Sequence, residues 1–148
     1  MNIYFICTGN TCRSPMAEAI LRSKAIAGVA VRSAGVSAVD GLPISTNAKT
    51  LIEEAGLPYT PVSNAITVEE LEWADLVLTM TMSHKAVLLH SFPEVEAKTF
   101  TLKEYATSGE FGDVHDPYGG SLATYRTTFD ELGTLIDRLK MKLTEDGA

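Results

Sequence analysis

Cys7 and Arg13 flank a short polar segment near the start of the chain, and their side chains suit the chemistry of phosphoryl groups. A thiolate is a strong nucleophile, and a planar guanidinium can bind two oxygens of one phosphoryl group at once. The residues between them are Thr8, Gly9, Asn10, Thr11 and Cys12. Because Gly9 and Asn10 tolerate positive φ, a tight loop can form whose backbone N–H groups converge on an anion above Cys7.

The residues on either side of this segment predict a strand, a loop and a helix in succession. The apolar run at 3–6 has the length of a buried strand, and Pro15 fits the first turn of a helix. The positive end of the helix dipole favours a thiolate, so we expect a depressed pKa for Cys7. Ser14 can donate a hydrogen bond to that thiolate; the alternative is a plain helix N-cap, and both roles can hold together. The alternative for Cys7 itself is a small buried hydrophobic residue.

A leaving group that departs as a strong base needs a proton, so an acid must lie opposite the nucleophile. Asp113 and Asp116, both in a region without a clear helical or strand pattern, are the candidates, and their local sequence does not separate them. Tyr118 follows and offers a flat wall for a phenyl ring or a guanidinium. A loop tyrosine without a role is the alternative.

Length and charge limit the classes of protein to consider. The 148 residues suit one domain spanning 1–148, with 45% hydrophobic and 21% charged residues. A net charge of −7 disfavours nucleic acid and anionic membrane surfaces as partners. We find no signal peptide and no apolar run of membrane-spanning length, so we expect a cytoplasmic protein, and we expect a monomer.

Cysteine and histidine usage predicts chemistry without a metal or cofactor. Cys7 and Cys12 are the only cysteines, which is no disulfide framework. His84, His90 and His115 show no metal-ligand spacing, and we expect them to be solvated or hydrogen-bonded at the surface.

Alternating strand and helix patterns predict an α/β fold with a parallel sheet covered on both faces. The expected strands are 3–6, 29–34, 76–80 and 99–102, and the expected helices are 14–27, 46–55, 67–74, 83–90 and 122–143. Residues 103–120 read as a long loop with room for one helical turn. In such sheets ligands bind beyond the carboxyl ends of the strands, where the cysteine segment follows the first strand.

Two motifs carry a resemblance to a known family. The pattern C-x5-R-S-P begins at Cys7, and Asp116-Pro117-Tyr118-Gly119-Gly120 lies far downstream. Together they resemble the low-molecular-weight protein tyrosine phosphatases over nearly the whole chain. The resemblance implies a three-layer sandwich with a four-stranded parallel sheet of order 2-1-3-4. It also favours Asp116 over Asp113 as the acid, beside catalytic Cys7 and Arg13.

The resemblance further implies a set of residues that bind the substrate: Thr8, Gly9, Asn10, Thr11, Cys12, Ser14 and Tyr118. Ser33 matches a family serine that supports the loop, and Asn10 is expected to hold the strained loop path. The threonine at position 11 most resembles a bacterial subgroup of protein-arginine phosphatases. This implies hydrolysis of phosphoarginine in phosphorylated proteins through a phosphocysteine.

Three other functions stay open at this point. Phosphotyrosine hydrolysis is the near alternative, because one side chain rarely fixes specificity alone. Arsenate reduction on the same fold requires further cysteines, and residues 13–148 contain none. A non-catalytic phosphate-binding module would not need the cysteine, the arginine and the acid together.

Cys12 lies in the same segment as Cys7, which suggests sensitivity to oxidants. A disulfide between the two would protect Cys7 from over-oxidation. The alternative is that Cys12 only fills space beneath the loop.

Overall fold

The computed structural model describes residues 1–107 and 112–146, and at its centre is a parallel sheet. Its strands are β1 (Asn2–Cys7), β2 (Ala30–Gly35), β3 (Leu76–Thr79) and β4 (Thr99–Thr101). Their spatial order is β2-β1-β3-β4, and each neighbouring pair is parallel. The strand order expected from the family resemblance is therefore confirmed, with β1 in the interior between β2 and β3.

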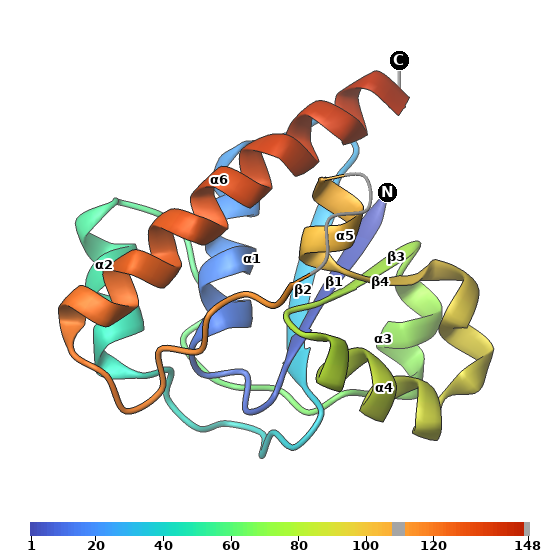
Figure 1. Cartoon of the computed structure of the whole chain (residues 1–148), viewed down its shortest axis with the longest axis horizontal. Helices are drawn as coiled ribbons and strands as arrows, with labels where there is room; N and C mark the ends of the chain where they lie inside the picture. The colour runs from blue at the N-terminus through green and yellow to red at the C-terminus, as the bar shows by residue number, and fades with distance from the viewer. Residues whose placement is uncertain (108–111, 147–148) are drawn as a thin grey trace.

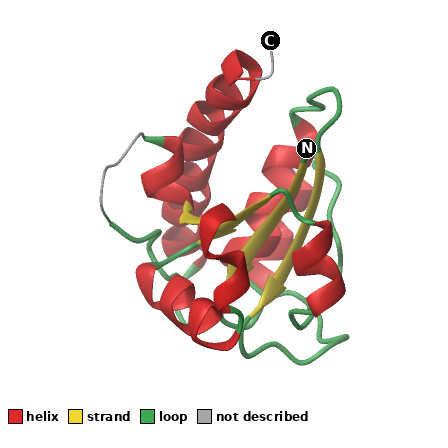
Figure 2. Cartoon of the chain, turned by 90° about the vertical axis from the view of Figure 1, so that its right-hand side faces the viewer, coloured by secondary structure: helices red, strands yellow, loops and turns green. Residues whose placement is uncertain are grey.

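Helices cover both faces of this sheet, as Figures 1 and 2 show. They are α1 (Arg13–Ser23), α2 (Thr46–Glu54), α3 (Val68–Trp73), α4 (Met82–Ser91), α5 (Leu102–Ala106) and α6 (Leu122–Asp146). Side chains alternate along β1: Ile3 and Phe5 pack with residues of α1, α2, α5 and α6, whereas Tyr4 and Ile6 pack with residues of α3 and α4. Both faces of the strand are buried, which explains its continuous apolar run. The three-layer α/β sandwich is confirmed.

Several boundaries differ from the sequence-based expectation. Helix α1 ends at Ser23 rather than at residue 27, because Ala25 takes a positive φ of 49° and the chain turns there. A 3₁₀ helix, η1 (Pro93–Lys98), was not predicted. Helix α5 begins at Leu102, the last residue of the expected fourth strand, and supplies the one helical turn for which the expected loop had room; Thr101 and Glu104 form a reciprocal capping box at its start. Residues 108–111 of that expected loop lie outside the described residues.

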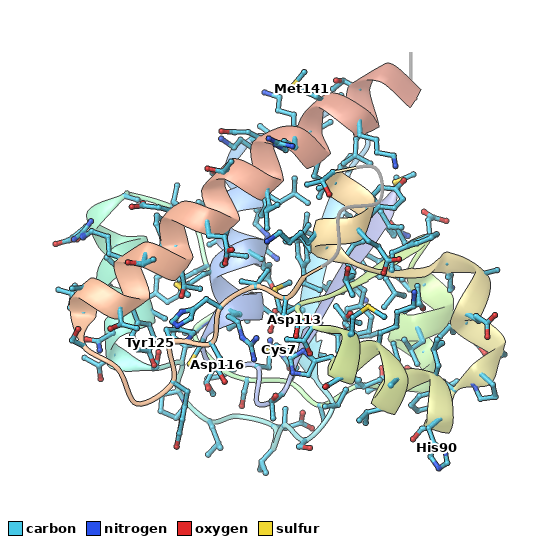
Figure 3. The ribbon with its side chains drawn as sticks, in the orientation of Figure 1. Cys7, His90, Asp113, Asp116, Tyr125 and Met141 are labelled. Atoms are coloured by element: carbon cyan, nitrogen blue, oxygen red, sulfur yellow. The ribbon has the colours of Figure 1, made fainter. Side chains whose placement is uncertain are left out.

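The carboxyl ends of the strands carry the segments that the sequence singled out. Cys7 is the last residue of β1, and Figure 3 places it close to Asp113 and Asp116 at this edge of the sheet. His90 lies well away from this group, at the far end of α4 (Figure 3). Within the described part of the chain, no helix combines the length and the apolar character needed to cross a membrane.

Candidate active site

The cysteine loop, residues 7–14, connects β1 to α1 and is held in shape by Asn10. This residue has a positive φ of 55° and is buried. Its side-chain Nδ2 donates to Ser14 Oγ at 2.8 Å and to Ser33 Oγ at 2.9 Å, and its Oδ1 accepts from the Asn64 N–H at 2.7 Å. The positive φ expected in this loop is thus found at Asn10, whereas Gly9 does not adopt one.

Carbonyl groups of the cysteine loop are bonded away from the centre of the loop. The pairs are Cys7 O with Val36 N, Thr8 O with Ser37 N, and Thr11 O with Ser45 N, each at 2.9 Å. The end of β2 approaches so closely that a Cβ on Gly35 would lie 2.4 Å from the Thr8 carbonyl oxygen. With these carbonyls bonded to segments outside the loop, the backbone N–H groups are the part of the loop main chain that suits an anion.

Cys7 lies at the floor of the loop and is only 3% exposed. Its Sγ is 2.8 Å from Ser14 Oγ, and because that oxygen accepts from Asn10, the Ser14 proton is free to donate to the sulfur. Burial raises the pKa of the Cys7 thiol, and hydrogen bonds from Ser14 and Asn10 together with the charge of Arg13 lower it. The depressed pKa expected from the sequence is wrong here, because desolvation outweighs the groups that favour the thiolate.

The two roles considered for Ser14 are separated by the structure. Cys12, not Ser14, occupies the N-cap position of α1, and it makes no side-chain capping bond. Ser14 therefore lies one residue inside the helix, where its hydroxyl contacts Cys7.

Arg13 joins the cysteine loop to a second segment, residues 112–121, which we call the aspartate loop. The Arg13 side chain is buried; its Nη1 donates to the Val114 carbonyl at 3.0 Å, and its Nη2 is 3.6 Å from Asp116 Oδ2. Asp116 is 58% exposed, and its Oδ1 accepts from the Tyr118 N–H at 3.0 Å. One carboxylate oxygen thus shapes the turn while the other faces Arg13.

Asp113 has a different environment. Its Oδ1 accepts from the Met82 N–H at 2.9 Å, at the first residue of α4. A carboxylate there compensates the positive end of a helix dipole.

Between the two loops lies a pocket of about 230 Å³. Its lining consists of Cys7, Thr8, Gly9, Thr11, Cys12, Arg13, Asp116 and Tyr118. All of these were site residues in the sequence-based prediction. Two other predicted residues, Asn10 and Ser14, are buried behind the loop, so their side chains support Cys7 rather than line the pocket. Tyr118 is 80% exposed at the rim.

Sequence reasoning missed residues that support the loop from below. Glu18 is a buried carboxylate that accepts from Ser33 Oγ and Thr60 Oγ1, both at 2.6 Å, and pairs with Arg22 at 2.9 Å. Ser33 thus connects Asn10 to a charged anchor. The i,i+4 spacing of Glu18 and Arg22 was an available signal, although such pairs are common on exposed helix faces.

Tyr125, near the start of α6, was missed as well. Its hydroxyl is 3.4 Å from Cys12 Sγ, and burial raises the pKa of this phenol. No local pattern identifies this contact, because 113 positions separate the two residues in the sequence. The sulfur of Cys12 also lies 3.7 Å from Ser45 Oγ, on the side of α2.

His84 corrects the expectation that the histidines lie at the surface. It is 6% exposed, and its Nε2 lies 2.7 Å from Thr8 Oγ1. Burial and the charge of Arg13 lower its pKa to about 4, so the ring is neutral near pH 7. His90 and His115 are exposed, as expected.

The described residues contain no cluster of three or more histidine, cysteine or acidic side chains that could hold a metal ion. The pocket instead combines a thiol, a buried guanidinium and an accessible carboxyl group within one small volume. Such a set can bind a phosphoryl group, attack it and transfer a proton.

Comparison with known proteins finds a family and relatives that match nearly the whole chain. The family model described as low molecular weight phosphotyrosine protein phosphatase matches residues 2–148. A protein-arginine-phosphatase of Geobacillus stearothermophilus is 50% identical over 141 residues, covering 95% of each chain. A low molecular weight protein-tyrosine-phosphatase, PtpB, of Staphylococcus haemolyticus is 41% identical over 140 residues, covering 95% of this chain and 98% of the relative.

One solved structure of a relative carries phosphate on an active-site residue. It is a mutant of the YwlE arginine phosphatase in which the active-site serine is phosphorylated. It superposes with a TM-score of 0.94 at 44% identity, covering 99% of this chain and 97% of that one.

Proposed function

This chain belongs to the low molecular weight phosphotyrosine protein phosphatase family, and we propose that it hydrolyses phosphoarginine in proteins through a phosphocysteine intermediate. The observation that carries the proposal is the meeting of Cys7, Arg13 and Asp116 in one pocket. The 50% identical relative, named as a protein-arginine-phosphatase, supports this choice of substrate.

In the first step Cys7 attacks phosphorus as a thiolate, which the Ser14 hydroxyl stabilises at 2.8 Å. The S–P bond forms while the P–N bond to the guanidine breaks, and Asp116 gives its proton to the leaving nitrogen. The amides of the cysteine loop and the Arg13 guanidinium hold the phosphoryl oxygens, whose negative charge must be stabilised throughout.

In the second step water replaces the protein as the phosphoryl acceptor. Asp116, now ionised, takes a proton from the water while the O–P bond forms and the S–P bond breaks. Cys7 returns as a thiolate, and inorganic phosphate is released. A phosphorylated serine at the active site of a relative agrees with transfer of phosphate to the side chain at this position.

We infer that Thr11 and Tyr118 select the guanidinium group of the substrate. Both line the pocket, and Thr11 offers a hydroxyl where an aliphatic residue would offer only an apolar surface. The Tyr118 ring, exposed at the rim, can stack on a planar group. Phosphotyrosine is the second candidate substrate, because a relative at 41% identity is named as a protein-tyrosine-phosphatase.

The deciding experiment is a parallel assay on matched phosphoarginine and phosphotyrosine peptides. We expect the larger kcat/KM for phosphoarginine and no turnover of either peptide by Cys7→Ser. A larger kcat/KM for phosphotyrosine would reverse the assignment of substrate. Turnover by Cys7→Ser at the wild-type rate would overturn the covalent route.

We also propose that Cys7 is redox-sensitive and that Cys12 resolves its oxidation. Both thiols are free in the structure. Peroxide would oxidise Cys7 to a sulfenic acid, and the Cys12 thiol would then displace water to form a disulfide. We further propose that the protein is cytoplasmic and monomeric and that it acts on phosphorylated proteins.

A further inference from the structure

His84 has one nitrogen in a hydrogen bond and one without. Nε2 lies 2.7 Å from the Thr8 hydroxyl oxygen. Nδ1 is buried and has no hydrogen-bond partner among the described residues. The backbone of His84 is held at the start of α4, since its N–H donates to the capping hydroxyl of Thr81 at 3.0 Å.

The unpartnered Nδ1 distinguishes the two neutral forms of the ring. If Nδ1 carried the proton, a buried N–H donor would be left without an acceptor, which native structures rarely tolerate. If Nε2 carries it, Nδ1 is a bare lone pair, and the N–H donates to Thr8 Oγ1. A charged ring would also leave the Nδ1–H unsatisfied and would stand near the Arg13 charge.

We propose that His84 is a positioning residue that makes the Thr8 hydroxyl a hydrogen-bond donor to the phosphoryl group in the pocket. A threonine hydroxyl has one proton. When Nε2–H donates to Thr8 Oγ1, that proton is not used by His84 and is available to the pocket that Thr8 lines. Without His84, the hydroxyl can rotate and donate elsewhere.

The chemistry of the substrate fits a donor at this place. In phosphoarginine the guanidinium offers only N–H donors, so the phosphoryl oxygens are its acceptors. The same oxygens accept in phosphotyrosine and in inorganic phosphate. The inference therefore extends the proposed phosphatase function, yet it concerns anion binding and holds for either peptide substrate.

The protonated nitrogen can be observed directly in the wild-type protein. ¹⁵N-edited NMR of the histidine rings distinguishes a nitrogen with a proton from one with a bare lone pair. We expect His84 to carry its proton on Nε2 at pH 7, with and without inorganic phosphate. A proton on Nδ1 would overturn the proposal, whatever the enzyme hydrolyses.

Binding of inorganic phosphate, measured by calorimetry, tests the role of the donor without any turnover. Thr8→Val removes the hydroxyl. His84→Asn places its amide at the position of Nδ1, too short to reach Thr8 Oγ1 as Nε2 does. We expect each to weaken phosphate binding by about 10- to 100-fold, as expected for one hydrogen bond to a charged group. His84→Gln places an amide N–H where Nε2 was, so its affinity for inorganic phosphate should lie within about threefold of the wild-type value.

The double variant His84→Asn, Thr8→Val separates positioning from general support of the fold. If His84 acts through Thr8, the double variant should bind phosphate no more weakly than Thr8→Val alone. Losses that multiply would show that His84 acts independently of Thr8 and would overturn the proposal. So would wild-type affinity in His84→Asn.

Discussion

Replacing Asp116 with asparagine tests which carboxyl group supplies the proton. The change keeps an oxygen that can accept from the Tyr118 N–H, so the turn of the aspartate loop should persist. The contact with Arg13 at 3.6 Å involves a side chain that is 58% exposed, and pairs of this kind contribute at most about 1 kcal/mol. The stability of the fold should therefore change little.

The rate should change according to the leaving group. Loss of general-acid catalysis is worth about 100- to 10,000-fold, or about 3–5 kcal/mol of barrier. A phosphoarginine peptide needs the proton and should show this loss in the rate constant of the first step, whereas p-nitrophenyl phosphate releases a stable anion and should lose far less in that step. The measurement is the single-turnover rate constant for release of the leaving group, compared between the two substrates in wild type and variant.

Asp113→Asn is the matched control, because this residue lies in the same loop and loses the same charge. Its Oδ1 accepts from the Met82 N–H, and asparagine keeps that acceptor. The lost charge at the start of α4 should cost only about 0.3–1 kcal/mol of stability. If Asp113→Asn shows the leaving-group dependence and Asp116→Asn does not, the assignment of the acid is refuted.

Four further outcomes are expected. Thr11→Ile should lower the ratio of phosphoarginine to phosphotyrosine kcat/KM by about 10- to 100-fold, since it deletes one hydrogen bond to a charged group, and an unchanged ratio would make Thr11 a packing residue. Gly35→Ala places its Cβ 2.4 Å from a backbone oxygen and should cost about 1–3 kcal/mol in urea unfolding, whereas Gly133→Ala meets nothing within 4 Å and should not destabilise. The pKa of His84 is lowered from 6.5 to about 4, so as the pH falls the unfolded chain takes up this proton before the folded chain does. The free energy of unfolding should therefore fall by about 3 kcal/mol between pH 6.5 and pH 4, and His84→Gln should lack this part of the pH dependence. After peroxide treatment, thiol should restore activity to the wild type but not to Cys12→Ser, and equal recovery of both would remove the resolving role.

The parts of the site that could be predicted from the sequence are those coded by neighbouring residues. The strand before Cys7 and the helix from Arg13 follow from an apolar run and a proline, and these fix where the loop must lie. Asn10 could be expected to take a positive φ because few other residues do so at low cost. The termination of α1 could not, because Ala25 adopts the same region without the composition that signals it.

What could not be predicted depends on contacts between distant segments. The burial of His84 results from its place at the start of α4 beside the cysteine loop, which no periodicity in 83–90 reveals. The pKa of Cys7 is raised because the fold removes water from the sulfur, although the hydrogen bonds of Ser14 and Asn10 and the charge of Arg13 all lower it. The extent of that burial cannot be seen in the local sequence. Asp113 and Asp116 differ in which element each meets, and only the folded chain decides this.

The bond from Arg13 to the Val114 carbonyl spans 101 positions of the sequence and sets an order of events during synthesis of the chain. Cys7 and Arg13 leave the ribosome well before Val114, the partner of that arginine, because 101 positions separate the two ends of the bond. Closing so long a loop is slow compared with forming neighbouring turns, and α6, which packs on α1, emerges later still. The proton donor can therefore join the nucleophile only after synthesis has passed Asp116, and a chain that stops before that point carries Cys7 without the acid that completes the reaction.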